Sequence, residues 1–180
     1  MDNIRFGKAA PEDADGIYAF YRTAIAKMHA GGNPMWDEND YPTAQLIARD
    51  AARGKLFALW IDGAPAAALV IDEEANDAYR GVPKDFVPLR PAVIHRLCVN
   101  PAFQGCGLSR LIMQKAEELI ARRGHDGILL DAFAQNNIAV SLYESLGYTN
   151  LGKVDIGVYI RDWHVVLFVK KISDEVQPPR

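Results

Sequence analysis

The chain has 180 residues, of which 49% are apolar and 24% are charged, and its 20 basic and 23 acidic side chains give a net charge of -3. This composition is typical of an ordinary globular protein, and the length suits one domain. The negative balance disfavours nucleic acid as a partner, and no apolar run is long enough to span a bilayer. Because Met1 to Phe6 has no signal core, we expect a cytoplasmic protein. In that compartment Cys98 and Cys106 are expected to be reduced thiols. No metal site is expected.

The first half of the chain predicts a strand, two helices and a hairpin. Residues 4–8 alternate weakly, and Pro11 with the acids that follow it indicates a helix start. Turn-forming residues then lead to a second helix over 42–52. Asp62-Gly63 separates two short apolar runs, 56–61 and 66–71, which predicts an antiparallel hairpin. The polar stretch 73–90 reads as a long surface loop, a type that is often functional.

The second half of the chain alternates strands and helices, which predicts an α/β protein. The expected elements are strands 92–99, 127–132, 149–154 and 163–171 and helices 107–123 and 137–146. In helix 107–123 the apolar residues form one stripe, so we expect the helix to pack on a sheet while its first residues stay accessible. One domain over residues 1–172 and a tail over 173–180 follow from this order.

A glycine loop joins strand 92–99 to helix 107–123. Gly105, Gly107 and Ser109 are small residues at alternate positions, which lets backbone N–H groups approach an anion at a helix start. Taken alone, the loop is a weak signal for a phosphate site, and a plain strand-to-helix turn is the alternative. The P-loop motif is excluded because no Lys-Ser or Lys-Thr follows the glycines. The dinucleotide-binding fingerprint is excluded because Arg110 stands at the position of its third glycine.

Two segments of this chain resemble the GCN5-related N-acetyltransferase (GNAT) superfamily. Its Arg/Gln-x-x-Gly-x-Gly/Ala loop matches residues 104–109, with Ser109 in place of glycine or alanine, and a second segment matches residues 137–148. The resemblance runs from about Ile4 to Ile172. It implies a single-domain α/β fold with a mixed, mostly antiparallel sheet of six to seven strands, flanked by about four helices.

The resemblance also implies acetyl-CoA as the cofactor and direct transfer of its acetyl group to a small-molecule amine. The pyrophosphate would lie on the glycine loop, and the pantetheine arm in a wedge between strands 92–99 and 127–132. The implied cofactor-binding residues are Leu97, Cys98, Val99, Gln104, Gly105, Cys106, Gly107, Leu108, Ser109, Arg110, Asn137 and Tyr143. Two alternatives stay open: a protein or peptide N-acetyltransferase, and a non-catalytic acyl-CoA-binding sensor. A homodimer is common in the family, and no membrane partner is expected.

His95 is the candidate general base. An amine with a pKa of about 10.4 is almost fully protonated at neutral pH, so attack on a thioester needs a proton acceptor. In a regular strand His95, Leu97 and Val99 share one face, and His95 lies about 13 Å from Val99, comparable to an extended pantetheine arm. A histidine here also resembles the arylalkylamine branch of the superfamily. A hydrogen-bonded structural histidine is the alternative.

Tyr143 matches the general acid of the family, because a phenol with a pKa of about 10 keeps its proton at neutral pH. We expect Ala139, Leu142 and Leu146 to form the buried stripe of helix 137–146 and Tyr143 to lie at its edge, where a packing tyrosine would look similar. Asn137 is both a plausible helix N-cap and the asparagine that the family places near the cofactor.

The acceptor amine is expected near Trp36, Tyr41 and Asp131. The two aromatic residues are predicted to be exposed on a loop, where packing against the protein surface is the alternative. Asp131 ends a strand and is a reserve candidate for binding the amine or for acting as a second base, although such carboxylates often cap turns. Neither Cys98 nor Cys106 has a neighbouring base in the sequence, which disfavours an acyl-cysteine intermediate.

Overall fold

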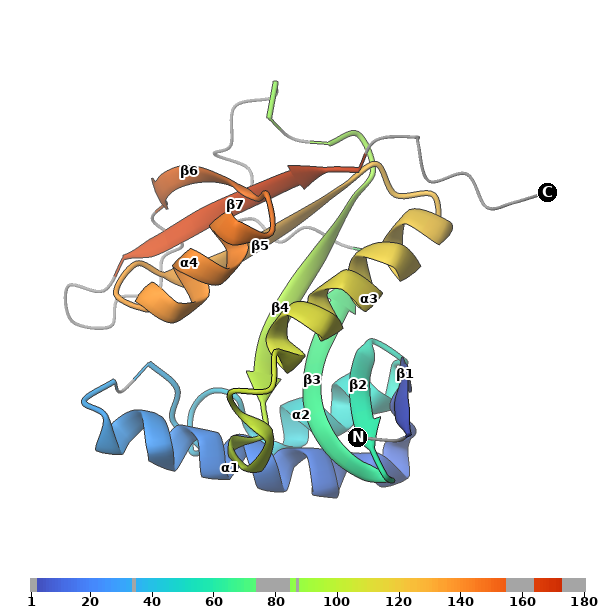
Figure 1. Ribbon diagram of the computed structural model, residues 1–180, viewed down its shortest axis with the longest axis vertical. Coiled ribbons are helices and arrows are strands. Elements are labelled where there is room, and N and C mark those ends of the chain that lie inside the picture. Colours follow the sequence, from blue (N-terminus) through green and yellow to red (C-terminus); the bar gives the residue numbers. More distant parts are fainter. Residues whose placement is uncertain (1–2, 34, 74–84, 87, 155–163, 173–180) are drawn as a thin grey trace. The chain divides into compact units, whose positions relative to one another are not determined.

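The computed structural model describes residues 3–33, 35–73, 85–86, 88–154 and 164–172 (Figure 1). Within them, seven strands form one sheet in the order β1-β2-β3-β4-β5-β7-β6. The strands are β1 Ile4–Lys8, β2 Leu56–Ile61, β3 Ala64–Asp72, β4 Pro91–Val99, β5 Gly127–Phe133, β6 Thr149–Val154 and β7 Val165–Lys171. The helices are α1 Ala14–Ala30, α2 Ala44–Ala52, α3 Leu108–Arg122 and α4 Asn137–Ser145.

The predicted fold class is confirmed. Strands β4 and β5 are parallel, and the other described pairs, β1 with β2, β2 with β3, β5 with β7 and β6 with β7, are antiparallel. The mixed, mostly antiparallel sheet and the four helices are those expected. No helix among the described residues is both long and apolar enough to cross a membrane.

The chain divides into two compact units. The first holds Met1–Ile71 and Arg96–Lys115, and the second holds Asp72–His95 and Ala116–Arg180. Strand β4 and helix α3 each contribute residues to both. The single domain over residues 1–172 stays a prediction, and the expected tail, 173–180, lies outside the described residues, as does most of the expected loop 73–90.

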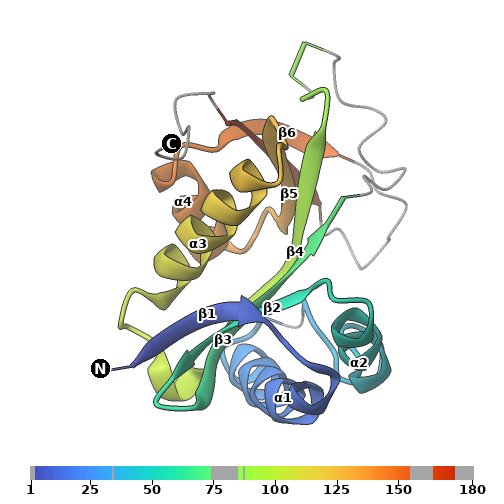
Figure 2. The same ribbon diagram turned by 90° about the vertical axis from the view of Figure 1, so that its right-hand side faces the viewer.

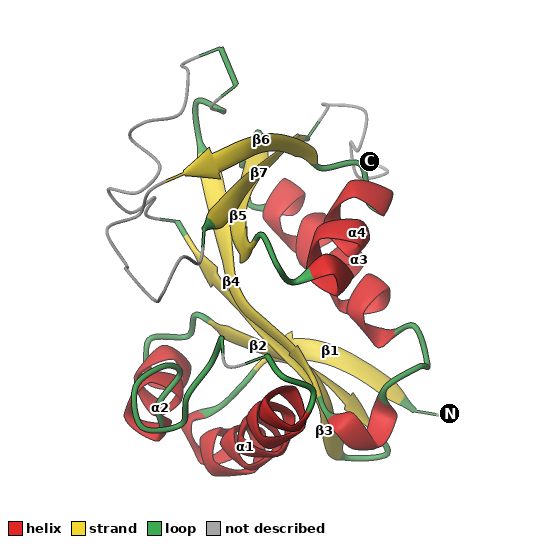
Figure 3. Ribbon diagram, turned by 90° about the vertical axis from the view of Figure 1, so that its left-hand side faces the viewer, coloured by secondary structure: helices red, strands yellow, loops and turns green. Residues whose placement is uncertain are grey.

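The hairpin of the first unit forms as predicted. Asp62 and Gly63 have φ angles of 49° and 84°, the paired left-handed conformations of a type I′ turn, which matches the twist of the flanking strands. All six residues of β2 are buried. Figures 2 and 3 show what covers one face of this strand: α1 and α2 both lie on the same face of this part of the sheet.

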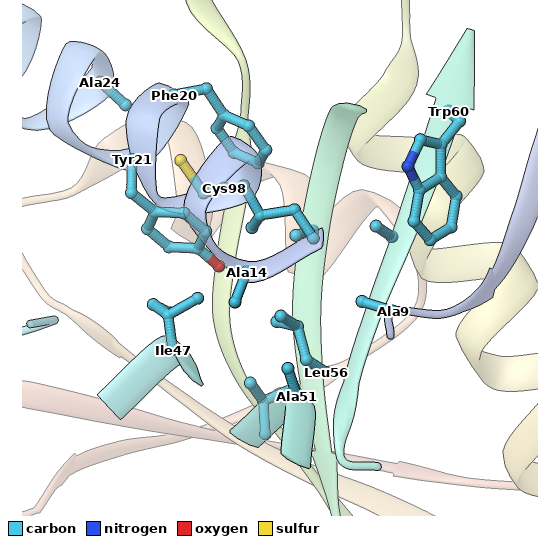
Figure 4. Packing of buried hydrophobic residues seen from close by; sticks show 14 residues of the cluster. Ala9, Ala14, Phe20, Tyr21, Ala24, Ile47, Ala51, Leu56, Trp60 and Cys98 are labelled. Carbon is cyan, nitrogen blue, oxygen red and sulfur yellow. The ribbon is translucent and has the colours of Figure 1, made fainter. Parts of the chain in front are cut away.

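The core of the first unit forms around α1. Its apolar residues recur at helical spacing, and the buried ones include Ile17, Phe20, Tyr21, Ala24 and Ile25. Figure 4 shows Phe20 and Tyr21 pointing into a cluster with residues of α2 and β2. Full burial of such a side chain contributes about 1.5–3 kcal/mol, so this stripe fixes α1 against the sheet.

Helix α2 begins two residues later than predicted. Ala44 is its first residue, because Thr43 is the N-cap and its hydroxyl accepts the N–H of Leu46 at 3.2 Å. The preceding residue, Pro42, which the sequence included in the helix, lies before this cap. The helix end agrees with the prediction, since Ala52 is its last residue.

In the second unit, the sheet is buried on both faces. Val93, Leu129, Leu167 and Val169 form one apolar cluster. On α4, the ring of Tyr143 packs against Phe168 of β7, with ring centroids 5.4 Å apart. Lys170 of β7 binds the carboxylate of Glu117 at 2.7 Å and the carbonyl of Leu146 at 2.8 Å. These contacts hold the second half of α3 and the end of α4 to the sheet.

Candidate active site

The glycine loop before α3 has the conformation that an anion site requires. Gly105 and Gly107 have φ angles of 82° and 73°, which only glycine adopts readily. A β-carbon added at either glycine would meet no atom within 4 Å, so open space lies beside the loop. The residues from Gln104 to Gly107 are exposed, whereas Leu108 is buried. A ligand therefore has room to approach the loop backbone closely.

The start of α3 offers hydrogen-bond donors to such a ligand. The N–H of Leu111 bonds to the carbonyl of Gly107 at 3.1 Å, which places Gly107 at the N-cap position. The N–H groups of the first turn have no intrahelical acceptor, and glycine has no side chain to cap them. The first turn also contains no acidic residue. Together with the helix dipole, these features favour a bound phosphate.

The base of the loop is firmly anchored. Leu108 packs with Ile61 and Ala66 in a small apolar cluster, against which Val99 and Phe103 also pack. The side chain of Asn100 donates to the carbonyl of Pro65 at 3.0 Å and accepts the N–H of Ala102 at 3.0 Å. The loop is thus presented by a rigid corner.

Lys27 is a residue near the loop that the sequence did not reveal. It lies in the last turn of α1, and its ammonium group donates to the side-chain oxygen of Gln104 at 2.6 Å. The two residues are 77 positions apart. No local pattern links residues so distant in the chain. The contact brings a positive charge to the predicted pyrophosphate loop.

Strand β4 is interrupted at Arg96, whose φ angle is 54°. A residue in the left-handed region breaks the alternation of side chains, as in a β-bulge. The expectation that His95, Leu97 and Val99 share one face assumed a regular strand, a condition that β4 does not meet at Arg96. That these three side chains share a face stays a prediction. The described pairs between β4 and β5 run from Pro91 with Gly127 to Ile94 with Leu130. His95, half-buried, comes directly after them, and its role as a base stays a prediction.

Tyr143 is the buried residue of α4. The sequence predicted that it lies at the edge of the apolar face of this helix, and that prediction is wrong. Tyr143 is 6% exposed, whereas Ala139, Leu142 and Leu146 are only half-buried. The helix is turned this way because the ring of Tyr143 packs against Phe168 on the sheet. Burial, with a smaller contribution from the negative charge of Asp131, raises the pKa of Tyr143 above its usual value. The phenol therefore remains a hydrogen-bond donor at neutral pH.

The asparagine that caps α4 is Asn136. Its side chain accepts the N–H of Ala139 at 3.2 Å, and Asn137 is the first helical residue and is exposed. The N-cap interpretation of Asn137 is therefore wrong. Two neighbouring asparagines offer the same capping group, and only the backbone path selects between them. A contact between Asn137 and the cofactor stays a prediction.

The two aromatic residues expected at the acceptor site differ in exposure. Tyr41 is 39% exposed, as predicted. Trp36 is half-buried, because its ring stacks on Tyr21 of α1 with centroids 5.8 Å apart. The prediction that Trp36 is exposed is wrong. Packing on the core gives this loop a fixed position on α1.

Neither cysteine has the environment of a nucleophile. Cys98 is buried in the core of the first unit, and burial raises the pKa of its thiol. Cys106 is exposed on the glycine loop, with its sulfur 3.9 Å from the carbonyl of Gln104. Among the described residues, no group of three His, Cys, Asp or Glu side chains is placed to hold a metal ion.

Comparison with known proteins gives three findings. A model of the acetyltransferase (GNAT) family matches residues 19–148. The chain is 27% identical to the L-methionine sulfoximine/L-methionine sulfone acetyltransferase of Salmonella typhimurium, over 98% of this chain and 97% of that protein. It is 36% identical over 62 residues to the ribosomal protein bS18-alanine N-acetyltransferase of the same organism, which covers 34% of this chain and 42% of that protein.

A search among solved structures agrees on the fold. A GNAT-family acetyltransferase from Streptococcus agalactiae superposes with a TM-score of 0.80 and 22% identity, over 96% of this chain and 98% of that one. The fold, the glycine loop and the family match thus agree with one another.

Proposed function

Because the chain belongs to the GNAT family of acetyltransferases, we propose that it transfers the acetyl group of acetyl-CoA directly to the amino group of a small molecule. The observation that carries this proposal is the glycine loop, with positive φ angles at Gly105 and Gly107 and open space beside both. A loop of this kind at a helix start suits a pyrophosphate. Lys27 adds a positive charge that the loop itself lacks.

A small-molecule acceptor is favoured by the extent of the match to known relatives. The similarity to the methionine sulfoximine and sulfone acetyltransferase runs from end to end, so it includes the segments between α1 and β4 that the family uses for its acceptor. The similarity to the bS18-alanine enzyme spans about a third of the chain. We therefore propose an acceptor of amino-acid size, and a protein or peptide substrate is the second candidate.

In this proposal, His95 removes the proton that the amine loses as its nitrogen bonds to the acyl carbon. Acetyl-CoA supplies that carbon as a thioester, whose carbon–sulfur bond breaks. Asp131 is the reserve base if the amine binds on its side. A proton acceptor of this kind typically accelerates such a step by about 10² to 10⁴-fold.

Tyr143 assists the departing sulfur. A buried phenol with a raised pKa is a weaker acid than a thiol, whose pKa is about 8.5, so complete proton transfer from Tyr143 is unfavourable. We therefore expect Tyr143 to donate a hydrogen bond to the negative charge that develops on sulfur. This donor is already desolvated and positioned, because the residue is buried and its ring packs against Tyr148 and Phe168.

The test is release of thiol from acetyl-CoA with the purified protein and a panel of acceptors. The panel contains methionine sulfone, methionine sulfoximine, other amino acids, aromatic amines and a peptide with an N-terminal alanine. We expect turnover with at least one small amine and sequential kinetics, since direct transfer needs both substrates bound. Turnover with the peptide alone would favour the protein-acetylating alternative. Tight CoA binding without turnover of any acceptor would favour the sensor.

A further inference from the structure

Arg96 has a backbone conformation that its side chain does not favour. Its φ angle of 54° lies in the left-handed region, which bulky residues other than glycine rarely adopt. Such conformations persist only where the surrounding structure fixes them, and they are frequent at functional sites. The residue stands directly between His95 and the strand segment Leu97–Val99.

Three residues from different segments hold Arg96 in place. One guanidinium nitrogen binds the carboxylate of Asp50 on α2 at 2.6 Å, and another donates to the hydroxyl of Tyr41 at 3.0 Å. On the backbone, the carbonyl of Arg96 accepts the hydroxyl of the fully buried Tyr21 on α1. Both the side chain and the main chain of Arg96 are thus held by neighbouring residues.

The ion pair between Arg96 and Asp50 is not expected to add much to the free energy of folding. The side chains of Arg96 and Asp50 are only 11% and 5% exposed, so both charges have lost most of their water. Buried ion pairs often contribute no net stability relative to apolar residues of similar size. Among the described residues, the Nε atom of Arg96 is also buried without a hydrogen-bond partner. Conformational control explains the cluster better than stability does.

We propose that Arg96 is a positioning residue: the clamp of its guanidinium by Asp50 and Tyr41 keeps β4 in the left-handed conformation at residue 96 and so directs Leu97–Val99. The inference rests on the proposed function and on the expectation that Leu97–Val99 contacts the acyl donor. Tyr41 belongs to the loop expected to contact the acceptor. A single side chain therefore links the conformation of the donor strand to the position of that loop.

The test removes both charges together, because removing Arg96 alone would leave Asp50 buried without a partner. In the Arg96→Met, Asp50→Leu double variant we expect a folded protein in which residue 96 reverts to an extended φ, as seen in a crystal structure. We also expect kcat to fall by about 10- to 100-fold, the size of effect that a misplacement of about 1 Å produces. The Kd for CoA should change less than kcat, since the glycine loop that is expected to hold the pyrophosphate is unchanged.

Arg96→Lys tests whether charge alone is sufficient. Lysine cannot hold a carboxylate and a hydroxyl in the fixed fork of a guanidinium, so we expect this variant to be slow as well. The matched control is Arg122→Gln with Glu118→Gln, which removes an exposed ion pair on α3 and should change neither readout.

Three results would overturn the inference: a double variant that keeps the positive φ, a double variant that turns over at the wild-type rate, and rescue of kcat by lysine. A wild-type protein that acetylates no amine would overturn the proposed function instead. In that case the φ angle of the double variant still decides the role of Arg96.

Discussion

The rings of Tyr143 and Tyr148 lie 5.9 Å apart, tilted by 59°, and both residues are buried. Burial raises the pKa of both phenols, with smaller contributions from the negative charges of Asp131 on Tyr143 and of Glu117 on Tyr148. The two tyrosines are thus alike in burial and in electrostatics. Only Tyr143 is proposed to donate a hydrogen bond to the departing sulfur, which makes Tyr148 a close internal control.

Replacing Tyr143 by phenylalanine is expected to lower kcat by about 10- to 100-fold, because the departing sulfur loses a positioned donor. The Kd for CoA should not change. Steady-state kinetics and calorimetric titration with CoA separate the two effects. Tyr148→Phe removes an equally buried hydroxyl and should keep nearly full kcat. Equal losses in the two variants would mean that packing, not hydrogen-bond donation, explains the effect of Tyr143.

Gly107→Ala is expected to raise the Kd for CoA by about 10-fold or more, because a β-carbon forces the backbone out of its left-handed conformation and crowds the phosphate. Gly63→Ala is the matched control. Gly63 also has a positive φ and open surroundings, but it lies in the β2–β3 hairpin. Both variants should lose similar stability in urea denaturation, about 1–2 kcal/mol. If Gly63→Ala weakened CoA binding as much, the glycine loop would not be the phosphate site.

Lys27→Gln is expected to raise the Kd for CoA by about two- to fivefold, the range of an exposed charge interaction. The difference should shrink as salt is added, because exposed charges are screened. CoA titrations at low and high ionic strength measure this. Lys153→Gln removes an exposed charge from β6 and should have no effect at either salt concentration. A salt-independent loss in Lys27→Gln would indicate a steric cause.

The elements that the sequence predicted well are those fixed by local physics. The Asp62-Gly63 turn needs only two residues that tolerate positive φ between two apolar runs. Strand β6 was predicted with its observed bounds, Thr149–Val154. The stripe of α3 requires only helical periodicity, and its buried residues include Leu108, Ile112 and Ile120, as expected.

The features that the sequence did not predict depend on contacts between distant residues. Trp36 is half-buried because Tyr21 of α1 offers its ring, and no pattern near Trp36 signals this. The left-handed conformation of Arg96 depends on Asp50 and Tyr41, which lie 46 and 55 positions away. The regular alternation assumed along residues 95–99 is therefore interrupted at Arg96 by contacts that no local pattern reveals.

His95→Gln is expected to lower kcat/KM most near neutral pH, because glutamine cannot accept a proton from the amine. The rate at high pH, where more of the amine is already neutral, should fall less. Asp131→Asn is the parallel experiment for the reserve base. A loss of kcat/KM near neutral pH in Asp131→Asn, with His95→Gln unchanged, would transfer the role of base to Asp131.

Folding stability should fall in alkaline solution, and Tyr21 should account for part of the loss. Burial, with a smaller contribution from Cys98, raises the pKa of Tyr21 well above its usual value. In the unfolded chain the phenol titrates at about pH 10, so above that pH the unfolded state binds fewer protons than the native state. The free energy of unfolding therefore decreases as pH rises, by up to about 1.4 kcal/mol per pH unit for each such group, and the contribution is fully present below about pH 10.

In Tyr21→Phe we expect two changes that oppose each other. Near neutral pH the variant should be less stable by about 1 kcal/mol, because the carbonyl of Arg96 loses its donor. Above about pH 10 its stability should decline less steeply than that of the wild type, so the two curves converge. Urea denaturation across the alkaline range measures both effects. Tyr18→Phe removes a half-buried phenol that also donates to a backbone carbonyl, that of Glu38, and is the control for the loss of such a hydrogen bond near neutral pH. Parallel curves for Tyr21→Phe and the wild type would show that the alkaline loss arises from other groups.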